Sequence, residues 1–335
     1  MNRSKIDYCD HTYNPITGCR HGCHYCYASR MVKRFSGDAR YNLMAKADYT
    51  TEPAEDDSGE VFVLEKPMFS SSGTQLIYPF GFMPTYHRYR VTECTLDKLS
   101  TGCTVFVGAM SDLFGEWVPE RWINEIFKIC EDRSQHQYLF LTKNPSRYRK
   151  LSLPTYDNFW YGTTITGTPE DMRIIHLPRK NAWVSIEPLR GPISQDVWEY
   201  LTKMKWIVIG AETGNVKGKV VPKIEWIQEI LEIADYNGIP VFMKESLEKI
   251  VGKENMRQDR PESMMEKNFA GKLARKMYDH CSKCKKRMMK SDMITISARS
   301  VRGEMPKKWM FLCKDCFRNL CDEMNIAPPE LKGLQ

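Results

Sequence analysis

The sequence predicts an α/β fold in which short buried strands alternate with helices. Three observations support this prediction: six short apolar runs in the middle of the chain, helical segments between several of them, and polar residues directly after each run. Runs that are apolar on both faces are typical of parallel strands covered by helices. Alternating units of this kind form either a doubly wound sheet or a barrel.

The six runs are rich in Val, Ile and aromatic residues, which favour strands. They are TVFVGAM (104–110), QYLFLTK (137–143), FWYGTTI (159–165), AWVSIEP (182–188), WIVIGAE (206–212) and IPVFMKE (239–245). Helices are predicted over 119–133, 194–204 and 222–238. The last of these has Pro222 in its first turn and Gly238 at its end, which is the asymmetry that helices prefer.

The length of 335 residues allows one large domain or two. Residues 1–250 are expected to form the α/β domain. Region 37–100, which lacks the strand and helix alternation, is expected to be an insertion in it. Residues 251–278 have the composition of a polar linker, and residues 279–335 form a separate cysteine-rich domain.

The polar residues that follow the runs are candidate site residues, because α/β proteins place their sites at the carboxyl ends of the strands. Loops are polar in any case, but the repetition after all six runs favours a site. The candidates are Ser111 and Asp112, Lys143 and Asn144, Thr163 and Thr164, Glu187, Glu212 and Thr213, and Lys244 and Glu245.

The composition is that of a globular protein, with 42% hydrophobic and 27% charged residues. The first residues contain no apolar run after the basic ones, and no apolar stretch of about 18 residues occurs, so neither a signal peptide nor a membrane span is expected. We therefore expect a cytoplasmic protein with no membrane partner. Its 12 cysteines are expected to be reduced, as metal ligands, catalytic groups or small buried side chains.

The net charge of +7 is unevenly distributed. Residues 271–320 hold 14 Lys and Arg against 4 Asp and Glu, whereas the rest of the chain is mildly acidic. This basic module favours nucleic acid as a partner, and a solvated lysine-rich surface is the alternative. His87, Arg88 and Arg90, in an aromatic and basic segment, are candidate substrate contacts or else part of a surface hairpin.

The stretch ITGCRHGCHYCYASR places Cys19, Cys23 and Cys26 on one loop, with the spacing C-x3-C-x2-C. A closed structural zinc site and a ferredoxin-type cluster each need four protein ligands. Three thiols suit a [4Fe–4S] cluster whose fourth iron stays open for the amine and carboxylate of a small molecule. The alternative is zinc with a fourth ligand from His21, His24 or Cys9.

This spacing, with Tyr25 before the last cysteine, resembles the signature of the radical S-adenosylmethionine (SAM) superfamily. YNPITGC, GAMSDLFGEWVP, LTKNPSRY, VSIEPLRGPI and IVIGAETG resemble its phage-associated three-cysteine-motif family, over about residues 8–244. The resemblance implies a partial (βα) barrel of about six or seven parallel strands, with a first strand at about 5–11. It also implies reductive cleavage of SAM to a 5′-deoxyadenosyl radical at a [4Fe–4S] cluster, with an electron donor such as flavodoxin or ferredoxin.

The resemblance further implies SAM contacts after the second and third strands. Ser111 and Asp112 stand where the superfamily often has a Gly-Gly-Glu-like sequence, and would accept hydrogen bonds from the SAM amino group. Lys143 would neutralise the SAM carboxylate. Alternatively, Asp112 caps a helix and Lys143 pairs with a neighbouring glutamate.

The later strands are expected to bind the rest of SAM or the substrate. Glu187 and Glu212 are candidates for binding ribose or substrate hydroxyls. Gly210 has no side chain, which would allow its backbone to approach the adenine closely.

A second cysteine cluster lies in the basic module. Cys281 and Cys284 form one C-x2-C pair, and Cys313 and Cys316 form another. Two such pairs predict a Zn2+ site with four thiolates in a small zinc-ribbon-like domain. A second [4Fe–4S] cluster is the alternative.

Three functions are compatible with these features. The first is a radical SAM enzyme that modifies or repairs a nucleic acid or nucleotide. The second is radical SAM modification of a peptide or small molecule, with a purely structural zinc domain. The third is a non-catalytic metalloprotein that binds nucleic acid. Cleavage of SAM separates the third function from the other two, and deletion of the basic module separates the first from the second.

Overall fold

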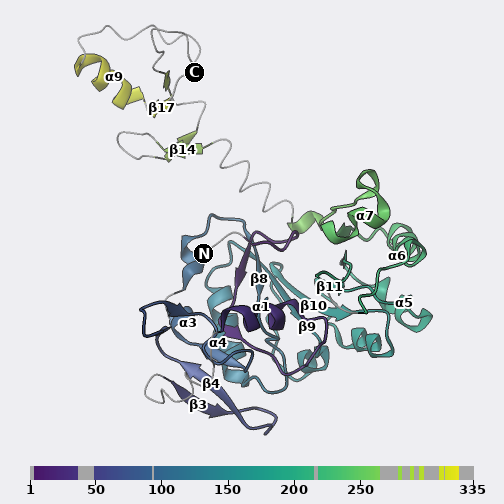
Figure 1. Cartoon of the computed structure of the whole chain (residues 1–335). Coiled ribbons are helices and arrows are strands. Elements are labelled where there is room, and N and C mark those ends of the chain that lie inside the picture. The colour runs from purple at the N-terminus through teal and green to yellow at the C-terminus, as the bar shows by residue number, and fades with distance from the viewer. Residues whose placement is uncertain are drawn as a thin grey trace. The chain divides into compact units, whose positions relative to one another are not determined.

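Figure 1 shows the computed structural model of the whole chain. The structure describes residues 4–36, 49–92, 94–214 and 218–264, and, nearer the C-terminus, residues 278–280, 287–289, 294–297, 309–312 and 314–323. The chain divides into two compact units, Met1–Met265 and Glu266–Gln335.

The main sheet of the first unit has seven parallel strands. Their spatial order is also their order along the chain, so each strand pairs with the next and the sheet forms a partial barrel. This confirms the predicted fold class. In order, the strands are β1 (His11–Tyr13), β8 (Thr104–Val107), β9 (Gln137–Thr142), β10 (Phe159–Ile165), β11 (Ala182–Ile186), β12 (Trp206–Ile209) and β13 (Val241–Met243).

The first strand lies later in the chain than predicted. Residues 5–10 form turns, because the Ser4 N–H donates to the Asp10 carbonyl at 2.8 Å and the Cys9 N–H donates to the Ile6 carbonyl at 3.2 Å. Strand β1 therefore begins only at His11, where it pairs with Val105 of β8. The prediction of a strand over 5–11 is wrong in position.

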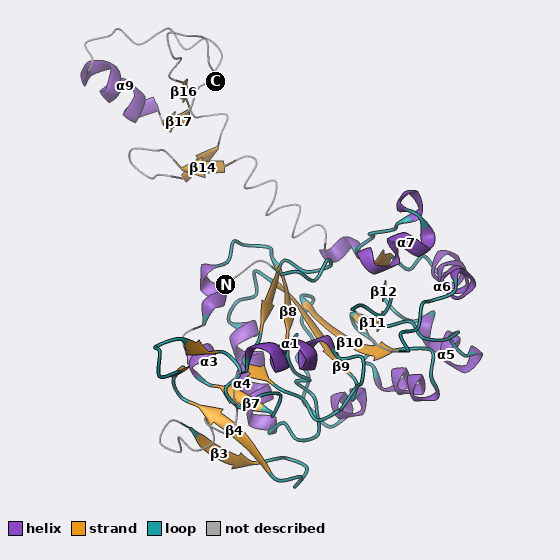
Figure 2. Cartoon of the chain, viewed as in Figure 1, coloured by secondary structure: helices purple, strands orange, loops and turns teal. Residues whose placement is uncertain are grey.

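Helices flank the outside of this sheet, as Figure 2 shows for α5 and α6 beside β11 and β12. The three helices predicted from sequence are present as α4 (Glu120–Glu131), α5 (Gln195–Leu201) and α6 (Ile224–Tyr236). Short 3-10 helices instead follow β9 and β10, namely η3 (Pro145–Arg149) and η4 (Pro169–His176). After β13 the chain continues through η5 (Glu245–Leu247), α7 (Glu248–Val251) and η6 (Lys253–Asn255).

Alternate residues of the strands pack on opposite faces of the sheet. Outward-facing residues such as Val105, Phe140 and Val184 pack against the helices in two large hydrophobic clusters. Inward-facing residues are mostly large and aromatic, and they surround Tyr8 inside the partial barrel. These inner residues include Phe106, Trp160, Trp183, Trp206 and Phe242. The aromatic residues therefore fill the interior at the level where the strands begin.

The predicted insertion forms small sheets beside the barrel. Four strands pair in the order β2-β7-β4-β3, and β2 comes from the loop that follows β1. The elements between β1 and β8, of which the first two precede the insertion, are β2 (Ile16–Thr17), α1 (Tyr27–Phe35), β3 (Thr50–Pro53), β4 (Glu60–Leu64), β5 (Met68–Phe69), β6 (Gln75–Leu76), β7 (Thr85–His87), α3 (Tyr89–Thr92) and η2 (Thr95–Lys98).

The second unit contains two antiparallel strand pairs and a helix. The pairs are β14 (Tyr278–His280) with β15 (Arg287–Met289), and β16 (Ile294–Ser297) with β17 (Trp309–Leu312); the helix is α9 (Lys314–Glu323). Cys316 is buried in α9, whereas Cys281, Cys284 and Cys313 lie outside the described residues. In the described part of the chain, no helix is both long and apolar enough to cross a bilayer.

Candidate active site

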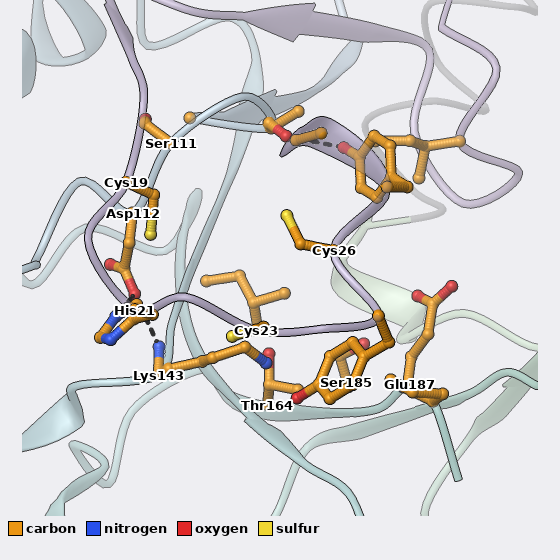
Figure 3. Close-up of a pocket in the computed structure, with 18 of the residues that line it drawn as sticks. Cys19, His21, Cys23, Cys26, Ser111, Asp112, Lys143, Thr164, Ser185 and Glu187 are labelled. Atoms are coloured by element: carbon orange, nitrogen blue, oxygen red, sulfur yellow. Dashed lines mark hydrogen bonds and ion pairs between the residues drawn. The ribbon is translucent and has the colours of Figure 1, made fainter. Parts of the chain in front are cut away.

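A cavity of about 190 Å³ opens at the carboxyl ends of the barrel strands. The three cysteines of the N-terminal loop line it together with polar residues that follow the strands. In Figure 3, Cys19, Ser111 and Asp112 lie on one side of the cavity and Glu187 lies on the opposite side. The predicted site residues in the lining are Cys19, Cys23, Cys26, Ser111, Asp112, Lys143, Thr164, Glu187, Glu212, Thr213 and Lys244.

The strand periodicity explains why these polar residues meet. Inward-facing positions recur every second residue, so each strand carries a fixed series into the barrel. On β11 the series runs from Trp183 through Ser185 to Glu187, and on β13 it runs from Phe242 to Lys244. Parallel strands place these series side by side, with aromatic rings below and polar groups above. The cavity therefore has an apolar floor and a polar upper wall.

The cysteine loop is held at both ends by backbone contacts. The Gly18 N–H donates to the Met110 carbonyl at 2.9 Å, and the Cys19 N–H donates to the Phe82 carbonyl at 3.1 Å. Gly18 has a φ of +86°, and a Cβ there would lie 2.2 Å from the Met83 carbonyl oxygen, so only glycine fits. At the other end, the Cys26 sulfur caps helix α1 by accepting from the Ser29 N–H at 3.4 Å.

Asp112 connects this loop to the barrel. Its carboxylate accepts hydrogen bonds from His21 Nε2 at 2.7 Å, Thr142 Oγ1 at 2.7 Å, the Lys143 N–H at 2.9 Å and the Phe114 N–H at 3.0 Å. Burial by itself would raise the pKa of Asp112, but the hydrogen bond and charge of His21, with the two contacts from the end of β9, lower it overall. The carboxylate is therefore held in its ionised form.

Cys19 is partly buried and lies close to the carboxylate of Asp112. Burial, followed by the charge of Asp112, raises the pKa of Cys19 far above its ordinary value. A thiol in this environment releases its proton only when a cation takes the proton's place. The position of Cys19 thus suits a ligand for a positively charged metal group.

Two predicted SAM contacts offer polar groups to the cavity. The Ser111 hydroxyl oxygen is buried and has no hydrogen-bond partner among the residues that the structure describes. The Lys143 ammonium lies 5.2 Å from the centre of the Tyr25 ring, and Arg190 approaches the same ring at 5.6 Å. The Tyr25 ring thus lies within contact distance of two cations, which is a favourable arrangement for its ring.

Glu187 and Lys244 form an ion pair across the strand that separates them. Their Oε1 and Nζ atoms are 2.5 Å apart, and both side chains are largely buried. Gly210 lies between the two, where a Cβ would be 3.1 Å from each side chain. Gly210 is not among the residues that line the cavity. Its lack of a side chain leaves space for the Glu187–Lys244 ion pair.

Glu212 is also buried in the wall. Its Oε2 atom has no hydrogen bond and lies 3.7 Å from Nε of Arg190. Sequence reasoning missed Arg190, because it comes four residues after the end of β11, and it missed Tyr8, which lines the floor. The alternation of inward-facing residues could have indicated the floor, whereas nothing in the local sequence marks Arg190.

The three candidate substrate contacts of the insertion lie away from this cavity. His87 is fully buried in β7, with its Nε2 atom 2.8 Å from Thr17 Oγ1. Arg88 pairs with Glu65 at 2.8 Å, and Arg90 donates to the Asn14 carbonyl at 2.8 Å. All three residues therefore have structural partners, and we propose no substrate contact for them.

Three thiols of one loop line the same cavity. Among the described residues, no group of three or more His, Cys, Asp or Glu side chains is arranged to hold one metal ion. In a [4Fe–4S] cluster each thiolate binds a different iron, so the sulfurs need not converge on one point. Three thiols and the unpartnered Ser111 hydroxyl around one cavity are compatible with a cluster that carries a small polar ligand.

Comparisons with known proteins give one family and one group of solved structures. Residues 3–280 match the family described as "Protein of unknown function (DUF5131)". No curated protein matches the chain. A structure of spore photoproduct lyase with dinucleoside spore photoproduct is similar at 10% identity, with a TM-score of 0.38, over 97% of this chain and 74% of that one. A mutant of that lyase with bound AdoMet and the same dinucleoside is similar at 9% identity, with a TM-score of 0.37, over 96% and 75%. These values are too low to support a conclusion about function.

Proposed function

The chain belongs to the family of unknown function DUF5131, and we propose that it is a radical SAM enzyme. The observation that carries the proposal is a single cavity with Cys19, Cys23 and Cys26 in its lining and charged and polar strand ends around it. Three thiols from one loop suit a [4Fe–4S] cluster with one open iron. SAM bound at that iron would then lie in the same cavity.

The protein's own residues bind and orient the cofactors. A [4Fe–4S] cluster held by Cys19, Cys23 and Cys26 would supply the electron for reductive cleavage of SAM, which would give methionine and a 5′-deoxyadenosyl radical. The free Ser111 hydroxyl accepts a hydrogen bond from the SAM amine, and Lys143 pairs with its carboxylate. Tyr8 and Phe106, on the apolar floor, exclude water. The electron comes from a donor protein such as flavodoxin or ferredoxin.

The proposed substrate is a nucleic acid or nucleotide. This part of the proposal is supported by the charge of residues 271–320, with 14 basic against 4 acidic side chains. A segment of this charge binds a phosphate backbone through counterion release, so the affinity for DNA or RNA should fall steeply as salt is added. Binding that is absent or independent of salt would contradict the proposal for the substrate, but not the SAM chemistry.

The SAM chemistry is tested with the anaerobically reconstituted full-length protein. We expect a brown protein that bleaches on reduction and forms 5′-deoxyadenosine from SAM in the presence of dithionite. A Cys23→Ala variant should lose both the colour and the product, because one of three ligands is missing.

Cys9→Ala is the matched control. Cys9 is buried outside the cavity, and its thiol donates to Ser4 Oγ at 3.3 Å. This variant should keep the cluster and the product. Loss of metal from Cys9→Ala would instead favour a site with four protein ligands. A wild-type protein that binds zinc and leaves SAM intact would overturn the proposed function.

A further inference from the structure

We infer that Asp112 and His21 position the cysteine loop and that Asp112 does not contact SAM. The inference rests on the proposed function, since the loop is positioned for the cluster. It gives Asp112 a role different from the one its place in the sequence implies. Both residues line the cavity, on the side where Figure 3 shows Cys19.

The first argument is that the hydrogen-bonding capacity of Asp112 is fully used. A carboxylate offers about four acceptor positions, two on each oxygen. Oδ1 accepts from Thr142 and Phe114, at 2.7 and 3.0 Å, and Oδ2 accepts from His21 and the Lys143 N–H, at 2.7 and 2.9 Å. No position is left for the amine of SAM. The adjacent Ser111 hydroxyl, by contrast, has no hydrogen-bond partner in the described part of the chain.

The second argument comes from where the four donors lie. Thr142 and Lys143 are at the end of β9, and Phe114 follows in the same loop as Asp112. These three donors fix the carboxylate to the sheet. The fourth donor, His21, lies in the middle of the cysteine loop, two residues from both Cys19 and Cys23. Asp112 therefore ties the middle of that loop to the barrel.

The third argument is that the other contacts act at the ends of the loop. Gly18 is bonded to the Met110 carbonyl at 2.9 Å, and the Tyr27 hydroxyl donates to the Ala109 carbonyl at 2.6 Å. His21 also packs edge-on against Trp117, with ring centres 5.0 Å apart. The loop is thus fixed at three points before iron arrives, and the entropy of ordering it is lost on folding instead of on cluster binding.

The test uses four full-length variants: His21→Ala, His21→Gln, Asp112→Asn and His24→Ala. Gln can place an amide donor near the position of His21 Nε2, so His21→Gln should behave as a partial rescue. His24 is the matched control, because it is a histidine of the same loop whose ring contacts Tyr25 at 5.0 Å. The side chain of His21 is 24% exposed, so His21→Ala should fold even if Asp112→Asn does not.

Two readouts are measured on the reconstituted proteins without SAM: the rate at which a chelator removes iron, and the EPR spectrum of the reduced cluster. We expect His21→Ala to lose iron roughly 10-fold faster than wild type, the lower end of the usual effect of removing a supporting residue, and to give an altered spectrum. His24→Ala should match wild type on both readouts.

SAM is then added to separate positioning from binding. If Asp112 contacts SAM, Asp112→Asn without SAM will match wild type in iron retention and in its EPR spectrum, and it will lose only the spectral change that SAM causes. That result overturns the inference and leaves the proposed function intact. Wild-type iron retention in His21→Ala also overturns the inference. A wild-type protein that binds no iron overturns the proposed function itself.

Discussion

At the scale of single residues, the site depends on which inward-facing positions are small. Gly210 is the clearest case, because the Glu187–Lys244 ion pair occupies the space that a side chain there would need. The sequence marks Gly210 only as a glycine near a strand end. The structure shows why a glycine is needed there: the side chains of Glu187 and Lys244, which follow the two adjacent strands, meet beside it.

Gly210→Ala should separate Glu187 from Lys244 and destabilise the barrel. The new Cβ would lie 3.1 Å from both side chains, and overpacking of this kind costs about 1–3 kcal/mol. Urea unfolding measures the loss. In the double variant with Glu187→Ala one of the two close contacts is removed, so the two costs should not add; full additivity would contradict the collision with Glu187.

Ser111→Ala should weaken SAM binding without changing the cluster. Loss of one hydrogen bond costs about 1 kcal/mol, which corresponds to roughly fivefold in affinity. Isothermal titration of the reconstituted protein with SAM measures the change. Ser70→Ala, in the exposed β5–β6 hairpin, is the control, and an unchanged affinity in Ser111→Ala would contradict the proposed contact.

At the scale of elements, the small sheet of the insertion supports the cysteine loop. β2, which directly precedes Gly18, pairs with β7 through Ile16 and Thr17. The buried contact between Thr17 and His87 joins the same two strands. The basic segment around β7 therefore stabilises the approach to the loop, and its histidine has a structural role.

His87 should make this sheet sensitive to acid. Burial, and then the charge of Arg90, lower the pKa of His87 well below its ordinary value. Below about pH 6.5 the unfolded chain binds a proton at His87 that the folded protein does not bind. The contribution of His87 to the free energy of unfolding is therefore fully present above that pH. It decreases as the pH falls, by up to about 1.4 kcal/mol per pH unit.

Urea unfolding of wild type and His87→Gln between pH 5 and 8, about the range in which histidine titrates, measures this contribution. Gln keeps a polar partner for Thr17 but does not titrate, so the variant should lose part of the decrease at low pH. His136, whose pKa is also lowered, mainly by burial, remains in both proteins. Identical pH profiles would show that His87 is not responsible.

At the scale of the whole molecule, the chain separates into Met1–Met265 and Glu266–Gln335. All the residues that line the cavity belong to the first unit. The predicted zinc cysteines and the whole basic segment, residues 271–320, belong to the second. We therefore expect the two proposed metal sites and the two proposed activities to be separable.

A protein that ends at Met265 should keep its iron and its cleavage of SAM. It should lose zinc and most of its salt-dependent affinity for nucleic acid, because Cys281, Cys284, Cys313 and Cys316 are removed with the basic residues. Metal analysis and DNA binding at two salt concentrations measure these changes. Zinc that remains with the truncated protein would contradict the predicted C-terminal site.

The sequence was sufficient to predict a parallel α/β fold, the six strands from β8 to β13 and the three-cysteine loop, whereas it left open whether the strands form a doubly wound sheet or a barrel. These features depend on local patterns: apolar runs, their period, and the spacing of cysteines along one loop. The polar residues that line the cavity at the strand ends could be predicted as well, because polar residues that end parallel strands share one edge of the sheet.

The contacts of those side chains could be seen only in the tertiary structure. In the structure, His87, Arg88 and Arg90 have partners in or beside the small sheet. Tyr8 lines the cavity, and Arg190 lies at its edge. The physical reason is that hydrogen bonds and burial join residues far apart in the chain: Asp112 meets His21 across 91 positions. No local pattern encodes such a contact, because it exists only once the strands have been placed side by side.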